Sequence, residues 1–127
     1  MDIPSVRSRI LVIDDDESYR ILLRHYLEKS GYDVIDAADG ANALRIVRVE
    51  QLQLLILDIV MPDMEGLETI QELRRQGNKT KILAVSGAGQ AQGYLKMAKL
   101  FGADATADKC TPMPELLGTV ATLIEQR

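Results

Sequence analysis

The chain has 127 residues, of which 46% are apolar, and this length predicts a single domain, residues 1–127, with one hydrophobic core. The 19 acidic residues outnumber the 15 basic ones, and the net charge of -4 argues against a nucleic-acid-binding surface, because phosphate contacts need a basic patch. One cysteine cannot build a disulfide framework, and neither a signal-peptide core nor an apolar run of about 18 residues is present, so we expect a cytoplasmic protein without membrane contact.

Five short apolar runs predict β-strands. The first, third and fourth are almost continuously apolar and rich in Ile, Val and Leu, which is typical of strands buried on both faces of a parallel sheet. The second is more polar, as an edge strand would be, and the fifth is short and mostly alanine. In chain order the runs are RILVID (9–14), YDVIDA (32–37), LQLLILD (52–58), KILAVS (81–86) and ADATADK (103–109).

Helical segments alternate with these runs. In 17–32 the apolar residues follow the i, i+3, i+4, i+7 spacing of an amphipathic helix, and Gly31 lies where a C-terminal cap is expected. The last segment begins with a proline in its first turn. In chain order the segments are 17–32, 40–51, 65–78, 91–103 and 114–127.

This strict alternation predicts an α/β fold: a doubly wound parallel sheet of five strands with helices on both faces and right-handed crossovers. Ligands of such sheets bind beyond the carboxyl ends of the strands, where the winding direction reverses. The residues that follow each predicted strand are therefore the candidates for function.

Acidic side chains stand at two of these strand ends. The first strand runs into Asp14, Asp15 and Asp16, and the third ends in Asp58. If the two strands are neighbours, two or three carboxylates converge, and their repulsion of about 1–4 kcal/mol per pair must raise pKa values or attract a cation. A hard divalent cation with oxygen ligands fits such a site, and Mg²⁺ fits best.

The fourth and fifth strands end in Ser86 and Lys109, which add a hydroxyl group and a fixed positive charge. An aspartate can accept a phosphoryl group and become an aspartyl phosphate. The transferring group needs positive charge on its oxygens and a polar group that orients it. The sequence therefore favours Asp58 as a phosphoryl-accepting nucleophile beside a metal ion.

Four segments together resemble the receiver domains of two-component response regulators: LVIDDDE, LLILDIVMPDMEG, ILAVSGAG and the lysine of ADKC, in the order and spacing of that family. The resemblance covers nearly the whole chain. It implies a flavodoxin-like (βα)5 fold with the strand order 2-1-3-4-5. It also implies a phosphorylation-dependent switch, not an enzyme, with at most self-phosphorylation and slow self-dephosphorylation.

The resemblance assigns a role to each matching position. Asp58 matches the phosphoacceptor, Ser86 the switch hydroxyl and Lys109 the phosphate-binding lysine. Asp14 and Asp15 match the acidic pair that holds Mg²⁺ together with Asp58 and the backbone carbonyl of Val60, with Asp15 as the direct ligand. The implied partners are a histidine kinase or phosphotransfer protein and a downstream effector or fused output domain.

Three departures from the family pattern carry expectations. Cys110 stands where proline usually follows the lysine, so we expect a trans Lys109–Cys110 bond and a cysteine that serves in packing. Thr106 replaces the usual aromatic residue, so either signalling runs through the helix after the fourth strand or the domain transmits weakly. Gly87, Gly89 and Gly93 favour the helix, because a switching segment needs low local stability. Val60 and Ala88 are apolar where polar side chains could orient water, which predicts slow self-dephosphorylation.

Other interpretations remain open. DDDES could be only a helix N-terminus, and Asp16 fits a cap better than a metal ligand. LVIDDDES also fits a haloacid-dehalogenase-like phosphatase with Asp14 as nucleophile, but that leaves Asp58 unexplained. GAGQAQG is a weak match to a nucleotide-binding turn. A degenerate receiver that acts as a constitutive interaction domain is the remaining alternative.

Overall fold

Five parallel strands form one sheet in the order β2-β1-β3-β4-β5, which confirms the predicted doubly wound fold. The computed structural model describes residues 7–60, 66–87 and 91–126. The strands are β1 (Arg9–Ile13), β2 (Asp33–Ala37), β3 (Leu54–Asp58), β4 (Lys81–Ser86) and β5 (Ala105–Asp108). The helices are α1 (Glu17–Lys29), α2 (Gly40–Val49), α3 (Gly66–Arg75), α4 (Ala91–Phe101) and α5 (Met113–Glu125).

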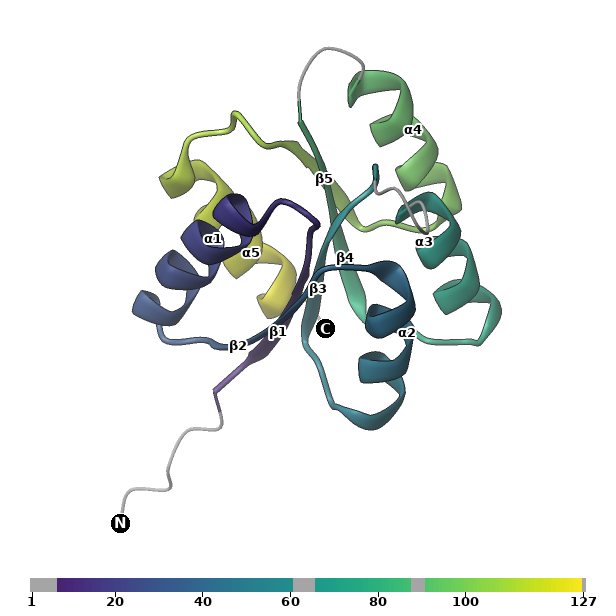
Figure 1. Cartoon of the computed structure of the whole chain (residues 1–127), viewed down its shortest axis with the longest axis horizontal. Coiled ribbons are helices and arrows are strands. Elements are labelled where there is room, and N and C mark those ends of the chain that lie inside the picture. Colours follow the sequence, from purple (N-terminus) through teal and green to yellow (C-terminus); the bar gives the residue numbers. More distant parts are fainter. Residues whose placement is uncertain (1–6, 61–65, 88–90, 127) are drawn as a thin grey trace.

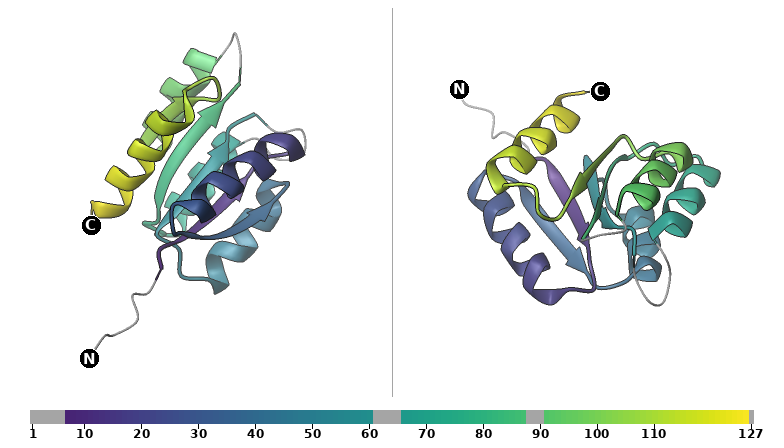
Figure 2. Two further views of the ribbon diagram at one scale, coloured as in Figure 1. Left: turned by 90° about the vertical axis from the view of Figure 1, so that its left-hand side faces the viewer. Right: turned by 90° about the horizontal axis from the view of Figure 1, so that it is seen from above.

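The helices cover the sheet from both sides. Helices α1 and α5 lie on one face, and α2, α3 and α4 lie on the other (Figure 1); the view from above in Figure 2 shows the sheet between the two helical layers. Strand side chains alternate between the faces. In β1, Ile10 and Val12 pack with α1 and α5, whereas Leu11 and Ile13 pack with the other three helices.

Strand β3 is the centre of the sheet, with β1 on one side and β4 on the other. All five of its residues are buried, from Leu54 to Asp58. The more polar β2 lies at the edge, as its composition predicts. Because β1 and β3 are neighbours, the acidic residues that follow the first strand and end the third lie side by side, at the carboxyl ends of the strands.

The elements end within three residues of their predicted bounds. The first helix ends at Lys29 because Ser30 caps it and Gly31 takes a φ of 99°, a conformation that favours glycine. The predicted fifth strand, 103–109, is shorter at both ends. The buried Ala103 precedes β5, and Lys109 follows it in a turn.

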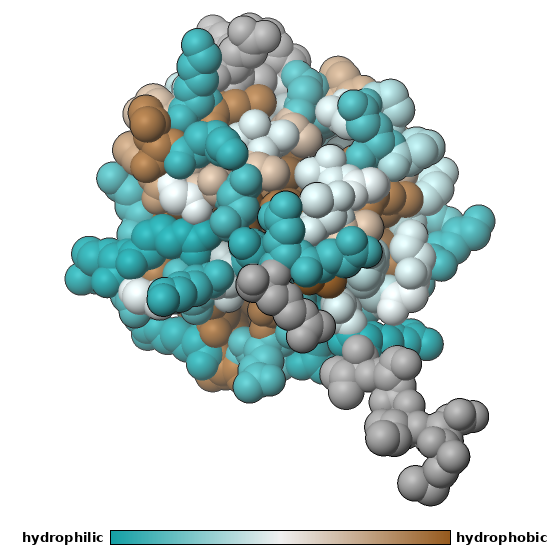
Figure 3. All heavy atoms as spheres, turned by 180° about the vertical axis from the view of Figure 1, so that it is seen from behind, coloured by the Kyte–Doolittle hydropathy of each residue, from teal (hydrophilic) through white to brown (hydrophobic). Residues whose placement is uncertain are grey.

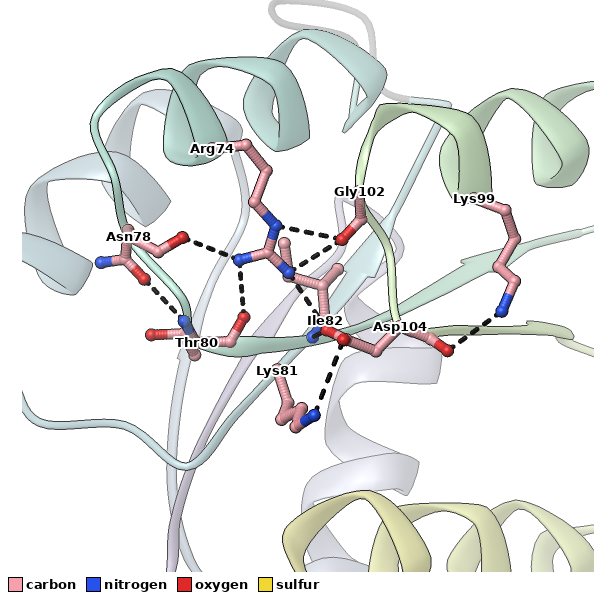
Figure 4. A network of polar contacts seen from close by, with 8 residues as sticks. All are labelled: Arg74, Asn78, Thr80, Lys81, Ile82, Lys99, Gly102 and Asp104. Atoms are coloured by element: carbon pink, nitrogen blue, oxygen red, sulfur yellow. Dashed lines mark hydrogen bonds and ion pairs between the residues drawn. The ribbon is translucent and has the colours of Figure 1, made fainter. Parts of the chain in front are cut away.

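At the amino ends of the strands, away from the acidic residues, the guanidinium group of Arg74 at the end of α3 joins several separate segments (Figure 4). Its Nη1 donates to the carbonyl oxygens of Asn78 (2.8 Å) and Thr80 (2.9 Å). Its Nε and Nη2 donate to the carbonyl oxygen of Gly102 at 3.0 and 2.8 Å, and Nη2 also reaches Asp104 Oδ2 at 3.0 Å.

Asp104 extends this network to the start of β4, because its Oδ2 accepts a hydrogen bond from the Ile82 amide at 2.8 Å. Gly102, with a φ of 121°, also makes room for the arginine: a Cβ there would lie 2.7 Å from Arg74 Cγ. The network therefore joins the ends of α3 and α4 to the starts of β4 and β5. It stabilises the amino ends of these strands, which lie away from the acidic residues.

Seen from behind, the surface is mostly hydrophilic, and apolar atoms gather in small separate groups (Figure 3). The most exposed large apolar side chain among the described residues is Leu100 on α4, at 83%. In the part of the chain that the structure describes, every helix is too short or too polar to cross a bilayer.

Replacing Arg74 by methionine should lower the free energy of unfolding by about 2–3 kcal/mol, because several partly buried carbonyl groups and Asp104 lose their donor. Arg75→Met is the matched control: the neighbouring arginine is exposed and pairs with Glu72 on its own helix, so its loss should change stability little. Urea unfolding of both variants measures the difference. Equal effects at the two positions would contradict the role given to Arg74.

Candidate functional site

Three carboxylates converge beyond the carboxyl ends of β1 and β3. Asp14, Asp15 and Asp58 each offer an oxygen, and these oxygens lie within 4.8 Å of one another. The pairing of Ile13 with Leu57 in the sheet puts Asp14 beside Asp58. Asp14 and Asp58 are buried, at 1% and 4% exposure, whereas Asp15 is exposed. The structure thus brings together the three acidic residues predicted as metal ligands.

Backbone contacts fix Asp14 in this position. Its amide donates to the carbonyl oxygen of Ala37 on β2 at 3.2 Å, and its Oδ1 accepts from the Asp16 amide at 2.8 Å. Arg20 Nη1, from the first turns of α1, donates to the Asp14 carbonyl oxygen at 2.7 Å. Asp16 itself caps α1 by accepting from the Tyr19 amide at 3.2 Å. The prediction that Asp16 is a cap is therefore confirmed.

Asp58 accepts two hydrogen bonds, one on each oxygen. The Val60 amide donates to Oδ1 at 3.0 Å, and Lys109 Nζ donates to Oδ2 at 3.2 Å. Burial is the main reason that the pKa of Asp58 rises to about 6; the charge of Asp14 raises it further, while the Val60 amide and Lys109 oppose the rise. These surroundings therefore disfavour the ionised form of this carboxyl group.

Lys109 supplies the positive charge at the centre of the cluster. Its Nζ lies 2.7 Å from Asp14 Oδ2 and 3.2 Å from Asp58 Oδ2. Burial lowers the pKa of Lys109, but the two carboxylates outweigh burial and the net pKa is raised. The Lys109 amide donates to the carbonyl oxygen of Ser86 at 2.9 Å, which fixes the lysine to the end of β4. Its ammonium group therefore stays charged between the two acids.

Ser86 ends β4 and is buried, at 1% exposure. It lies opposite Asp108 in the register of β4 with β5, so its strand end lies beside the turn that carries Lys109. Val60 is half exposed, and its amide points to Asp58; the role of its carbonyl group as a metal ligand stays a prediction. The predicted residues Ala88 and Gly89 lie outside the described residues.

The prediction that Cys110 serves in packing is wrong, because the cysteine is exposed in the turn after β5. Its amide donates to Asp108 Oδ1 at 2.7 Å, and the hydrogen bond and charge of Asp108 raise the pKa of the thiol. The peptide bond between Lys109 and Cys110 is trans, as predicted; no cis bond occurs in the described part of the chain. Thr106 lies on β5 opposite Ala84 and is partly buried.

The sequence prediction assigns no role to two residues near the site, Gly66 and Tyr19. Gly66 begins α3 directly against the end of β3: its amide donates to the Ile59 carbonyl oxygen at 3.1 Å, and a Cβ would lie 2.4 Å from the Asp58 carbonyl oxygen. A helix that starts with glycine instead of a better helix former is a signal for such a close approach. The ring of Tyr19 faces Lys109, with Nζ 4.8 Å from the ring centroid, and the sequence gives no signal for this contact.

Comparison with known proteins gives one consistent family. The family model for the response regulator receiver domain matches residues 10–121. Among curated proteins, the alkaline phosphatase synthesis transcriptional regulatory protein PhoP of Bacillus subtilis is 36% identical over 109 residues, which are 86% of this chain and 43% of PhoP. Response regulator MprA of Mycobacterium ulcerans is 35% identical over 122 residues, 93% of this chain and 50% of MprA. The chain spans about half the length of these relatives.

Solved structures agree with this result. The response regulator protein TrrA from Thermotoga maritima, in complex with Mg²⁺ and BeF, has a TM-score of 0.82 and 32% sequence identity, and the match covers 91% of this chain and 98% of TrrA. The chemotaxis response regulator CheY4 of Vibrio cholerae has a TM-score of 0.84 and 29% identity, and the match covers 93% of this chain and 99% of CheY4.

Replacing Asp58 by asparagine should stabilise the metal-free protein by about 1–2 kcal/mol near pH 7.5. Folding raises the pKa of Asp58 from 3.8 to about 6, so this group stabilises the fold at low pH, and that stability is lost as the pH rises through about 6. Asparagine carries no charge and keeps an oxygen for the Val60 amide.

The measurement is urea unfolding of both proteins in EDTA at about pH 5 and about pH 7.5, on either side of the raised pKa. The advantage of Asp58→Asn should shrink at the lower pH. A variant that is less stable than the wild type near pH 7.5 would show that the buried carboxylate is fully compensated by its neighbours.

Proposed function

Because this chain belongs to the response regulator receiver domain family, we propose that it is a phosphorylation-dependent signalling switch in which Asp58 accepts the phosphoryl group. The observation that carries the proposal is the environment of Asp58, which is buried at the end of the central strand between a lysine ammonium group and a second carboxylate. Such a carboxylate is fixed in one orientation, as a nucleophile for an in-line transfer must be.

The donor set fits Mg²⁺. Mg²⁺ takes oxygen ligands, preferably carboxylates, and the three carboxylates offer oxygens within 4.8 Å of one another. Asp14, Asp15 and Asp58 would hold the ion together with the backbone carbonyl group of Val60, and Asp15 would be a direct ligand. When bound, the ion supplies positive charge to the phosphoryl oxygens and offsets the repulsion among the acids.

In the proposed step, an oxygen of Asp58 attacks the phosphorus atom of a phosphohistidine on the donor protein. A P–O bond to Asp58 forms while the P–N bond breaks, and the imidazole nitrogen leaves with the bonding electron pair and takes up a proton. Lys109 turns its ammonium group from the carboxylates to the phosphoryl oxygens, and the Ser86 hydroxyl group binds one of those oxygens. Because the transfer changes no oxidation state, it needs neither an oxidant nor a reductant.

The proposed donor is a histidine kinase or phosphotransfer protein, and the phosphorylated domain acts on a downstream effector or a fused output domain. The relatives support an output function, since PhoP is named as a transcriptional regulatory protein. Direct nucleic acid contact by this domain is not proposed, because its net charge is -4. The proposed location is the cytoplasm, which the domain would share with its phosphoryl donor. We do not propose that the domain turns over a substrate. At most it phosphorylates itself and slowly dephosphorylates itself.

Two of the alternatives from the sequence, a phosphatase and a degenerate receiver, fit less well. A haloacid-dehalogenase-like phosphatase would use Asp14 and Asp16 as nucleophile and acid, but Asp14 accepts from the Asp16 amide and pairs with Lys109, while Asp16 caps α1. A degenerate receiver is favoured only by Thr106 and the trans bond before Cys110. The intact cluster of acids and lysine argues for phosphoryl transfer.

Intact mass spectrometry after incubation with acetyl phosphate and Mg²⁺ tests the proposal. One phosphoryl adduct is expected on the wild type, and none on Asp58→Asn or in EDTA, because both the nucleophile and the metal are required. An adduct that persists in Asp58→Asn would place the acceptor elsewhere. The absence of any adduct under all conditions would favour the degenerate interaction domain.

The phosphorylated protein should lose its phosphoryl group slowly, because the half-exposed Val60 offers no polar group to orient attacking water at Asp58. Val60→Asn should speed the loss severalfold, as followed by intact mass over time after removal of acetyl phosphate. Val60→Ala is the control and should leave the rate unchanged. Rapid loss from the wild type that no substitution of Val60 alters would refute this explanation.

Phosphorylation should change α4 more than α1. Thr106 is too small to act as a swinging aromatic residue, and α4 contacts both β4 and β5 while carrying Gly93 near its start. Hydrogen exchange of the free and phosphorylated protein should therefore differ across residues 93–101. Unchanged protection in α4, with changes confined to other helices, would contradict this route.

A further inference from the structure

An aromatic ring and the lysine ammonium group meet beside the carboxylate cluster. Tyr19 lies in the first turn of α1, and Lys109 follows β5 far along the chain. Lys109 Nζ lies 4.8 Å from the centroid of the Tyr19 ring, within the roughly 6 Å over which a cation is attracted by the face of an aromatic ring. The attraction is strongest where the cation is shielded from water, and the Lys109 side chain is only 16% exposed.

The position of the ring is fixed from two sides. The Tyr19 amide donates to the capping carboxylate of Asp16 at 3.2 Å, which fixes the first turn of α1. The partly buried ring packs against the apolar core between the sheet and helices α1 and α5. Burial is the main cause that raises the pKa of Tyr19 to about 12, so the phenol stays neutral near neutral pH. The lysine therefore faces a ring that brings no charge to the site.

The other contacts of the Lys109 ammonium group indicate a separate role for the Tyr19 ring. An ammonium group has three N–H donors and no acceptor. Lys109 Nζ donates to Asp58 Oδ2 at 3.2 Å and forms an ion pair with Asp14 Oδ2 at 2.7 Å, and the stem of the lysine passes Gly87, where a Cβ would lie 3.5 Å from its Cδ. The face of an aromatic ring attracts the ammonium group without a lone pair that competes with phosphoryl oxygens. Tyr19 can thus hold the group near the cluster while its donors change partners.

We propose that Tyr19 is a positioning residue for phosphoryl transfer, whose ring holds the Lys109 ammonium group beside Asp14 and Asp58, where the phosphoryl oxygens arrive. The inference rests on the proposed function and deepens it, since it assigns a role to a residue outside the acidic cluster. It differs from a role in core packing alone, because it requires an aromatic face and not merely an apolar side chain of similar size.

Two substitutions separate these roles. Tyr19→Phe keeps the aromatic face and removes the hydroxyl group, whereas Tyr19→Leu keeps an apolar side chain and removes the face. Tyr26→Leu is the matched control, because Tyr26 lies on the same helix, is partly exposed and stacks edge-on with His25. Circular dichroism and urea unfolding establish that each variant folds before any rate is compared.

The first readout is the rate of adduct formation from acetyl phosphate with Mg²⁺, followed by intact mass. We expect Tyr19→Leu to be about tenfold slower than the wild type, and Tyr19→Phe and Tyr26→Leu to stay within about twofold of it. The second readout is the NMR signal of the Lys109 methylene protons next to the ammonium group. Ring currents should shift this signal upfield in the wild type and Tyr19→Phe, and the shift should vanish in Tyr19→Leu.

Each other outcome overturns the inference in a recognisable way. Wild-type phosphorylation with an equally fast Tyr19→Leu would leave the ring a packing residue. A Tyr19→Phe variant as slow as Tyr19→Leu would assign the effect to the hydroxyl group. A Lys109 signal without an upfield shift in the wild type would show that the ring and the ammonium group are apart. A wild type that forms no adduct would overturn the proposed function itself and this inference with it.

Discussion

The repulsion among carboxylates at one edge of the sheet is the constraint on which the rest of this structure depends. Asp14, Asp15 and Asp58 converge there, and Asp14 and Asp58 are buried, so water screens their charges poorly. Lys109 contributes one positive charge between two of them. Burial, and to a smaller extent the charge of Asp14, raises the pKa of Asp58 to about 6, while the Val60 amide and Lys109 oppose this rise. An added cation would offset the repulsion among these acids.

The fold holds this unfavourable cluster in place through contacts that lie in different elements. The neighbouring positions of β1 and β3 bring the acids together, and Gly66 lets α3 begin directly against the backbone of Asp58. At the far edge, Arg74 and Asp104 join α3, α4, β4 and β5. Polar contacts thus hold one end of the strands, and the buried acids Asp14 and Asp58 lie at the other end.

The sequence predicts local features and the residues at strand ends well, because hydrophobic periodicity and strand topology determine them. The buried β3, the edge position of β2 and the convergence of Asp14 with Asp58 follow from such patterns. Contacts between distant segments leave no periodic signal, and for that reason Tyr19 at Lys109 was not predicted. The prediction that Cys110 serves in packing is wrong, because the turn after β5 holds the cysteine in solvent.

Carboxyl ¹³C NMR of Asp58 as a function of pH, without and with saturating Mg²⁺, tests the central claim most directly. Burial and the charge of Asp14 predict a titration midpoint near 6 in EDTA. With Mg²⁺ the midpoint should fall well below the ordinary aspartate value of about 4, since the ion favours the ionised form. A midpoint near or below 4 in EDTA that Mg²⁺ does not move would show that Lys109 already compensates the cluster and that the site has no need of a metal.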